Sequence, residues 1–302
     1  MSKQGRRQQS GRQQPGRPPQ GGRGRPKGGP QRKDQRGQRG STPLRERDEE
    51  SEGRDGIGGE QVEGRHAVRE LLLAGTRKTR ELVVSSGMDS APILDDIIGL
   101  AQEQKVSIRE MGRSKFDGLA RTDGAQGVIG FAKPLHRHEL DDLVQPSASG
   151  EPPFLLFLDG VTDPGNLGAI LRTAECAGVT GVVLPKHRAA RITAAVTKTA
   201  AGAIEHLRIA NVPGLPAALK SLGSHDIWSY GLDAGGSQTL FEADFADRGV
   251  ALVMGAEGTG LSRLVEQRCD VVLSIPLRGV LGSLNVANAA TLAMFEVVRS
   301  RG

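Results

Sequence analysis

The stretch FLLFLDGVTDPGNLGAILRTAECAGVTGVVLP, residues 154–185, decides the fold. It begins with the apolar run 154–158 and ends with the apolar run 181–184, both of which we interpret as buried strands. Between them, residues 166–177 predict a helix, because apolar side chains recur there at helical spacing: Leu167, Ile170, Leu171 and Ala174. Two short buried strands joined by a helix are typical of a parallel sheet that is covered on both faces.

The same alternation continues to the end of the chain. Further strands are expected at 207–210, 227–232, 250–254 and 271–275. Helices fit between and after them at 192–200, 214–222, 262–268 and 285–299. Residues 154–302 therefore predict one α/β domain with a parallel sheet.

A second, smaller α/β domain is expected over residues 57–133. Helices are predicted at 65–74, 91–104 and 114–120, and strands at 81–85, 106–109 and 126–132. These residues contain no cluster of side chains that suggests catalysis. Residues 134–153 lose the periodicity and gain Pro, Ser and acidic residues, so we interpret them as a linker.

The N-terminal residues 1–56 differ in composition from the rest. Residues 1–45 carry 13 Lys or Arg against one acid, with ten Gly, nine Gln and only two apolar residues. Such a segment cannot bury enough apolar surface to offset its ordering entropy, so a disordered basic tail is predicted. Its Gly-Arg repeats favour loose binding to a polyanion such as RNA. The alternative is a solubilising tail without a specific partner.

Composition also excludes several classes of protein. The longest uncharged run, 279–295, has 17 residues, fewer than the roughly 20 that span a membrane, and no signal peptide is visible. Cys176 and Cys269 show neither metal nor disulfide spacing, which suits a reducing cytoplasm. We expect Cys176 to be a buried small hydrophobic residue. His136 and His138 lack a nearby third ligand, so no metal site is predicted.

Three loops that follow buried strands could carry chemistry, because open α/β sheets bind ligands beyond the carboxyl ends of their strands. In the first loop, Asn166 is a natural helix N-cap. Arg172 points away from the apolar stripe of its helix and lies beside this loop. A solvated surface arginine is the alternative interpretation.

The other two loops are rich in glycine. The second, 255–262, contains one charged residue, Glu257, and Ser262 is expected to cap the next helix. The third, 275–285, is apolar for an exposed loop, so other parts of the chain or a ligand should cover it. Asn285 at its end could cap the last helix or contact a ligand.

These three loops resemble the motifs of the SpoU (TrmH) branch of the SPOUT RNA ribose methyltransferases. The matching stretches are NLGAILRT at 166–173, MGAEGTGLS at 254–262 and IPLRGVLGSLNV at 275–286. The front domain is similar to the L30e-like substrate-binding domain of the family, through EGRHAV at 63–68 and QGV at 126–128. The basic tail has no counterpart in the family pattern.

The resemblance implies a deep trefoil knot at the C-terminus, which buries the third loop and holds S-adenosylmethionine. Cofactor contacts then fall on Gly255, Ile275 and Leu284. Such knotted enzymes pair through this domain, so a homodimer assembled through the helix 285–299 is expected. By motif, the catalytic positions are these: Asn166, Arg172, Glu257, Ser283 and Asn285.

The resemblance further implies methylation of a ribose 2′-hydroxyl in RNA. Arg172 would contact the target phosphate and ribose, and Glu257 would hold Arg172. Because the family's tRNA enzymes typically lack the front domain, a guanosine of 23S rRNA is the expected substrate. A tRNA guanosine-2′-O-methyltransferase, a resistance-type rRNA adenosine methyltransferase and a non-catalytic RNA-binding ribosome-assembly factor are the alternatives.

Overall fold

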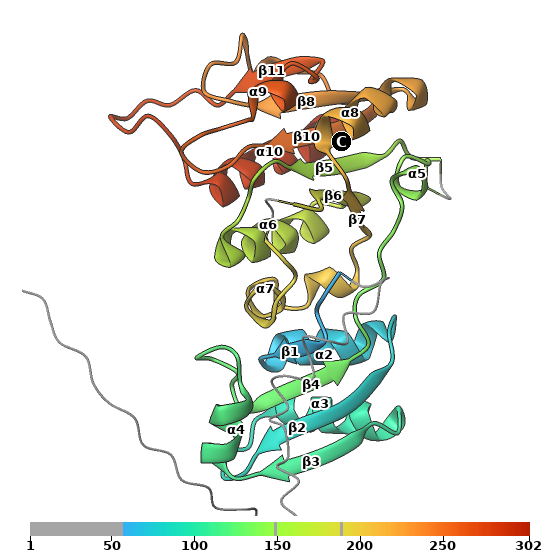
Figure 1. Cartoon of the computed structure of the whole chain (residues 1–302), viewed down its shortest axis with the longest axis vertical. Helices are drawn as coiled ribbons and strands as arrows, with labels where there is room; N and C mark the ends of the chain where they lie inside the picture. Colours follow the sequence, from blue (N-terminus) through green and yellow to red (C-terminus); the bar gives the residue numbers. More distant parts are fainter. Residues whose placement is uncertain (1–56, 148–149, 188–189) are drawn as a thin grey trace, which may run out of the picture. The chain divides into compact units, whose positions relative to one another are not determined.

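The computed structural model describes residues 57–147, 150–187 and 190–302, which belong to one compact unit (Figure 1). The predicted disordered tail, 1–56, lies outside the described residues. The described part contains two sheets, one from each expected domain. No described helix is long and apolar enough to cross a membrane.

The front domain is built on a four-stranded sheet with the order β1-β4-β2-β3. These strands are β1 (Gln61–Glu63), β2 (Thr79–Ser85), β3 (Ser107–Met111) and β4 (Val128–Ala132). Strand β4 runs antiparallel to β1 and β2, whereas β2 and β3 are parallel. The helices are α2 (Arg65–Ala74), α3 (Pro92–Glu103) and α4 (Arg113–Leu119), and apolar side chains of α2 and α3 share one core with the sheet.

The C-terminal domain is built on a seven-stranded parallel sheet with the order β7-β6-β5-β10-β8-β11-β9. The strands are β5 (Phe154–Leu158), β6 (Gly181–Pro185), β7 (Ile209–Val212), β8 (Ile227–Leu232), β9 (Gln238–Thr239), β10 (Gly249–Met254) and β11 (Val271–Ser274). Strands β5 and β10 are buried along their whole length, as expected for the centre of a sheet that is covered on both faces.

Helices cover both faces of this sheet. One face packs against α6 (Pro164–Cys176), α7 (Ala194–Thr199) and α10 (Val286–Arg301). The other packs against α5 (Leu140–Leu143), α8 (Leu215–Leu222) and α9 (Arg263–Glu266). Successive residues of β5 alternate between the two cores, with Leu156 in the first and Leu155 in the second, because strand side chains alternate in direction. The predicted parallel α/β fold is confirmed, while the trefoil knot stays a prediction.

The segment expected to be a linker has structure of its own. It carries α5, whose Leu143 is fully buried in the core of the C-terminal domain. His138 pairs with the edge strand β7 through a hydrogen bond from its backbone N–H to the Ile209 carbonyl, 3.0 Å long. The Pro and acidic residues of 134–153 therefore mark a packed connection.

Three expectations about helices α6 and α9 need correction. Helix α6 begins at Pro164, and its N-cap is Asp163, whose side chain accepts a hydrogen bond from the Asn166 N–H. Asn166 therefore lies inside the first turn, because proline favours the first helical position and aspartate the cap before it. Cys176 is exposed at the last residue of α6, off the apolar stripe, so its predicted burial is wrong. The helix expected at 262–268 is also shorter, at Arg263–Glu266.

Three additional helical turns complete the described chain. They are η1 (Ala203–Glu205), η2 (Gly223–His225) and η3 (Leu240–Glu242), each of three residues. Of these, η1 connects α7 to β7 and lies against α2 of the front domain and α6 of the C-terminal domain. The two described domains therefore share packed contacts.

Candidate functional site

A cavity of about 510 Å³ lies where strands β8, β10 and β11 end, next to one another in the sheet. Its walls come from the loops after these three strands and from the start of α10. The three residues predicted to contact a cofactor line this cavity: Gly255, Ile275 and Leu284. The carboxyl edge of a parallel sheet is where ligands bind in this type of fold.

The loop after β10 is folded tightly back on itself at Gly255. Ala256 and Gly260 exchange backbone hydrogen bonds of 3.0 Å in both directions. A Cβ atom on Gly255 would lie 2.2 Å from the Gly260 carbonyl carbon, and Gly258 and Gly260 have positive φ angles. Only glycine permits this close approach of two backbone segments, so the glycines shape the cavity wall.

The remaining wall is largely apolar, with contributions from β8, β10 and the third loop. Among these side chains are Leu232, Met254, Ile275, Leu277, Leu284 and Val286. One carboxylate, Asp233, also lines the cavity, and the sequence analysis did not select it. Asp233 directly follows the predicted strand 227–232. The sequence analysis selected three loops because they follow buried strands, so the same criterion could have selected Asp233.

A chain of hydrogen bonds joins three of the predicted catalytic residues. The Asn166 Nδ2 donates to Glu257 Oε2 at 3.1 Å, and the Asn285 Nδ2 donates to Asn166 Oδ1 at 2.9 Å. These residues are 91 and 119 positions apart in sequence. The fold therefore brings the three separate loops into one polar network.

Asn285 does two things at once in this network. Its Oδ1 accepts hydrogen bonds from the N–H groups of Ala287 and Asn288, at 2.9 and 3.4 Å, so it caps α10. Its Nδ2 is the group that binds Asn166. The two alternatives that the sequence left open, a cap and a contact within the site, are thus both present in one side chain.

The other two predicted catalytic residues are exposed. Ser283 lines the cavity, while Arg172 lies on the solvent side of α6. Within the described chain, Arg172 has no hydrogen bond or ion pair, and Glu257 binds Asn166 in its place. The expected contact between Glu257 and Arg172 is therefore absent, which leaves the guanidinium free to meet a ligand.

Ser262 occupies the predicted N-cap position of α9. Its side chain makes no capping hydrogen bond, whereas its backbone N–H donates to Asp159 Oδ2 at 2.7 Å. The carboxylate of the first loop thereby fixes the end of the second loop.

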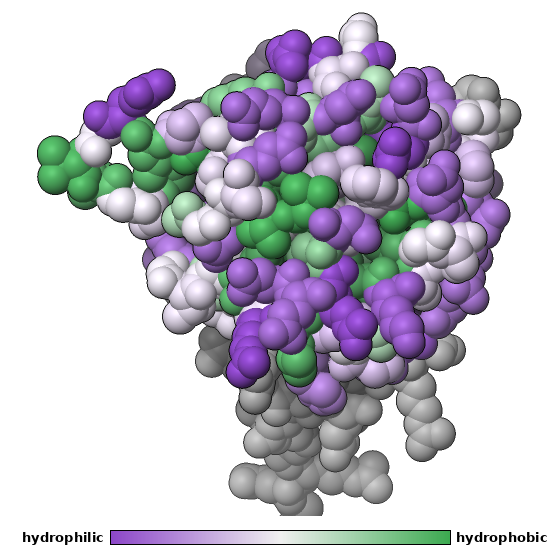
Figure 2. All heavy atoms as spheres, turned by 90° about the horizontal axis from the view of Figure 1, so that it is seen from above, coloured by the Kyte–Doolittle hydropathy of each residue, from purple (hydrophilic) through white to green (hydrophobic). Residues whose placement is uncertain are grey.

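The third loop projects from the domain with apolar side chains exposed. Val280 is fully exposed at 104%, and Leu281 at 81%. The loop 275–285, orange-red in Figure 1, leaves β11 and returns to α10. Figure 2 shows apolar residues gathered at a projecting corner of this end of the molecule. The expectation that other parts of the chain bury this loop is therefore wrong for its tip.

Comparison with known proteins shows the family to which this fold and site belong. The profile of the SpoU rRNA Methylase family matches residues 153–295, and that of RNA 2'-O ribose methyltransferase substrate binding matches residues 61–138. The fold and the site thus define an RNA ribose methyltransferase with a separate substrate-binding domain. The chain belongs to the SpoU rRNA methylase family.

Relatives agree with this assignment, and a solved structure shares the fold. The chain is 42% identical to the 23S rRNA (guanosine-2'-O-)-methyltransferase RlmB of Escherichia coli over 207 residues, which cover 68% of this chain and 84% of the relative. It is 39% identical to the protein of the same name from Vibrio cholerae, over 70% of this chain and 83% of the relative. In fold, it resembles an rRNA methyltransferase from Sinorhizobium meliloti with a TM-score of 0.67 and 24% identity, over 85% of this chain and 90% of that chain.

Proposed function

We propose that the protein transfers a methyl group from S-adenosylmethionine to the 2′-oxygen of a guanosine ribose in 23S rRNA. The observation that carries the proposal is the joining of three distant loops into the Glu257–Asn166–Asn285 network beside a cavity at the carboxyl edge of the sheet. The E. coli and V. cholerae relatives, named for this reaction on 23S rRNA, support the choice of substrate.

The residues of the cavity suit S-adenosylmethionine. The volume of about 510 Å³ is within the roughly 300–1,000 Å³ of small-molecule sites. Apolar side chains such as Ile275 and Leu284 suit a purine ring, and the close turn at Gly255 leaves backbone groups at the wall. The Asp233 carboxylate suits a hydroxyl or ammonium group of the cofactor. When bound, S-adenosylmethionine supplies an electrophilic methyl group.

The polar residues have distinct roles in this proposal. Arg172, exposed beside the first loop, binds the phosphate and ribose of the target nucleotide and stabilises negative charge that develops at the 2′-oxygen. It does not act as the base, because a guanidinium stays protonated in proteins. The hydrogen-bonded chain fixes Glu257, and Ser283 and Asn285 orient groups around the ribose. Correct orientation of the hydroxyl is itself a large catalytic contribution.

We also propose a homodimer that forms through α10. The small-residue stripe of this helix, which includes Ala290 and Ala293, packs inside its own domain and is not available for pairing. A separate apolar face remains exposed: Leu292, Phe295 and Val298. Pairing of this face with a second copy would remove it from water.

The two free cysteines suit a reducing compartment, and we place the protein in the cytoplasm.

The reaction is tested by transfer of a labelled methyl group from S-adenosylmethionine to a 23S rRNA transcript. The product is mapped by reverse transcription at low nucleotide concentration, which pauses at a 2′-O-methyl group. Total RNA from a strain that lacks the gene should lose one such guanosine. Labelling of tRNA in place of 23S rRNA, or labelling of a base, would overturn the proposal.

A further inference from the structure

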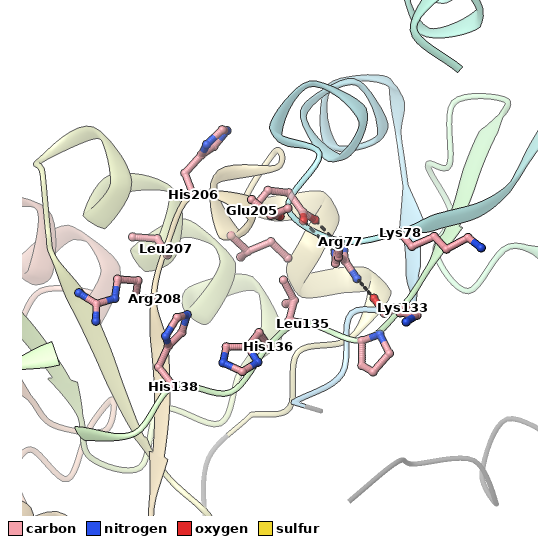
Figure 3. Close-up of a pocket in the computed structure, with 13 residues that line it drawn as sticks. Arg77, Lys78, Lys133, Leu135, His136, His138, Glu205, His206, Leu207 and Arg208 are labelled. Atoms are coloured by element: carbon pink, nitrogen blue, oxygen red, sulfur yellow. Dashed lines mark hydrogen bonds and ion pairs between the residues drawn. The ribbon is translucent and has the colours of Figure 1, made fainter. Parts of the chain in front are cut away.

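A second cavity, of about 800 Å³, lies at the junction of the two described domains (Figure 3). It is lined by residues 76–78, 133–136 and 138 from the front domain and the connection, and by residues 204–208 around η1. We call it the junction pocket. It shares no lining residue with the cavity at the carboxyl edge of the sheet. Its volume is within the roughly 300–1,000 Å³ that ligand sites occupy.

A buried ion pair fixes one wall of the junction pocket. Arg77 Nη2 and Nε donate to the two carboxylate oxygens of Glu205 at 2.6 and 2.9 Å, and the Glu205 side chain is fully buried. The Arg77 Nη1 also donates to the carbonyls of Gly59 and Lys133, each at 2.6 Å. A bidentate pair with these additional partners holds segments of both domains in a fixed relation.

Arg208 and two histidines gather at the other end of the junction pocket. Figure 3 shows Arg208 beside His138, with His136 next to it. The rings of His136 and His138 are 4.8 Å apart, and the backbone of His138 is held by the edge strand β7. Arg208 Nη2 donates to the Asp142 carbonyl at 2.5 Å, which anchors the guanidinium while leaving its other N–H groups available.

Among the lining residues, no carboxylate is left to pair with Arg208. Glu205 is the one acid among the lining residues, and Arg77 neutralises it. Burial, together with the nearby His136 and Arg208, lowers the pKa of His138, as expected where positive groups are crowded. The charged and titratable groups in and around the pocket are these: Arg77, Glu205, Lys78, Lys133, His136, His138, Arg208, Asp142, His206 with its partner Glu70, and Arg137 with its partner Glu139.

We propose that the junction pocket binds a phosphate group of the RNA backbone through Arg208, His136 and His138, at a distance from the methyl-transfer centre. This inference rests on the proposed function, because it assigns a second contact to the same RNA. Arg208 supplies a charge-assisted hydrogen bond to phosphate, and each histidine ring supplies an N–H donor that carries charge when the ring is protonated. His136 is exposed, so a nucleic acid chain reaches this end of the pocket from solvent.

The position of the pocket makes it a separate anchoring point. Strand β7 is three strands away from β10 in the sheet, which corresponds to roughly 15 Å. The pocket lies before the first residue of β7, whereas the methyl-transfer centre lies beyond the last residue of β10. An RNA that occupies both must run from one end of the strands to the other, so the junction pocket sets how the substrate is placed across the two domains.

The test measures RNA binding by the full-length protein as a function of salt. The probe is a fluorescent 23S rRNA fragment, titrated between 50 and 200 mM KCl, at pH 6 and pH 8. Arg208→Gln keeps a donor for the Asp142 carbonyl but removes the charge, and Arg208→Lys restores the charge. His136→Gln changes an exposed side chain without a hydrogen bond in the described structure. Lys220→Gln, which removes one exposed charge from α8, is the matched control.

Arg208→Gln should weaken RNA binding about three- to tenfold and lower the slope of log K against log salt by about 0.7–0.9, the value for one lost phosphate contact. Arg208→Lys should recover most of that slope. Wild-type binding should tighten as the pH falls from 8 to 6, since phosphate binding favours protonated histidines, and His136→Gln should reduce this dependence. Lys220→Gln should match the wild type.

Equal slopes for Arg208→Gln, His136→Gln and Lys220→Gln would overturn the proposal. A second arm titrates inorganic phosphate by calorimetry. If Arg208→Gln abolishes binding of free phosphate but leaves RNA binding unchanged, the pocket takes a small anion and the inference is wrong. Failure of the wild type to methylate RNA would refute the proposed function alone, because the salt slopes are measured without methyl transfer.

Discussion

Asn285 uses one side-chain atom to cap α10 and another to bind within the site, so substitutions can remove one role and keep the other. Its Oδ1 caps α10, and its Nδ2 donates to Asn166, which in turn donates to Glu257. Asn285→Asp retains the capping oxygen and adds negative charge at a helix N-terminus, which is favourable there. It removes the Nδ2 donor, so two oxygens face each other at the Asn166 contact unless the Asn166 amide turns over.

Rotation of the Asn166 amide determines how far the rate of methyl transfer should fall. If Asn166 turns its amide to donate to the introduced carboxylate, its oxygen faces the Glu257 carboxylate, and the hydrogen bond to a charged group is lost. Such a bond is worth about 1.5–3 kcal/mol, so the rate of methyl transfer should fall about 10- to 100-fold. The free energy of unfolding should change by less than about 0.5 kcal/mol, because the cap is kept. Asn285→Ala should lose the activity and also about 1 kcal/mol of stability, since the cap is removed as well.

Urea unfolding and single-turnover methyl transfer measure the two effects in the same preparations. Asn288→Asp is the matched control, because it makes the same chemical change one turn along α10 at an exposed position. The reasoning about the network fails if Asn285→Asp transfers the methyl group at the wild-type rate. The reasoning about the cap fails if Asn285→Ala unfolds at the same urea concentration as the wild type.

Three further outcomes are expected. Gly255→Ala should weaken S-adenosylmethionine binding at least tenfold by calorimetry, because the added Cβ meets the Gly260 backbone, whereas Gly223→Ala, whose Cβ meets no atom within 4 Å, should bind normally. Phe295→Glu should yield a monomer in analytical ultracentrifugation, since it places a charge in the exposed face of α10, and a persistent dimer would refute that interface. Burial and nearby acids raise the pKa of the Cys269 thiol to about 12, so iodoacetamide at pH 8 should label the exposed Cys176 much faster, and equal labelling rates would contradict the described packing.

The sequence predicted the architecture well where apolar spacing controls it. The strands Phe154–Leu158 and Ile227–Leu232 and the helix Arg65–Ala74 lie at the predicted residues, because each is a clear run or stripe of apolar side chains. Strands β1 and β9 were not predicted, since they have three and two residues and depend on neighbouring strands for pairing. Helix α5 was missed because its burial comes from tertiary packing of Leu143, which local composition does not show.

For the site, the sequence indicated the participants but not their partners. Asn166, Glu257 and Asn285 were expected together, and the structure joins them. The partner of Glu257 was predicted to be Arg172, and the structure gives Asn166, because hydrogen bonds between loops 91 residues apart depend on the exact path of each loop. The sequence did not predict the junction pocket, since its residues come from two domains and from the segment interpreted as a linker.

The central claim is that Arg172 acts on the reacting ribose, and one measurement tests it most directly. Arg172 is exposed and without a partner in the described chain, so Arg172→Ala should leave the free energy of unfolding within about 0.5 kcal/mol of the wild type. S-adenosylmethionine affinity should stay within a few-fold, because Arg172 does not line the cavity. Single-turnover transfer of a labelled methyl group to a 23S rRNA fragment should slow by on the order of 10²–10³, as for loss of a positioned charge at a reacting oxygen. A variant that retains more than about a tenth of the wild-type rate would contradict the account.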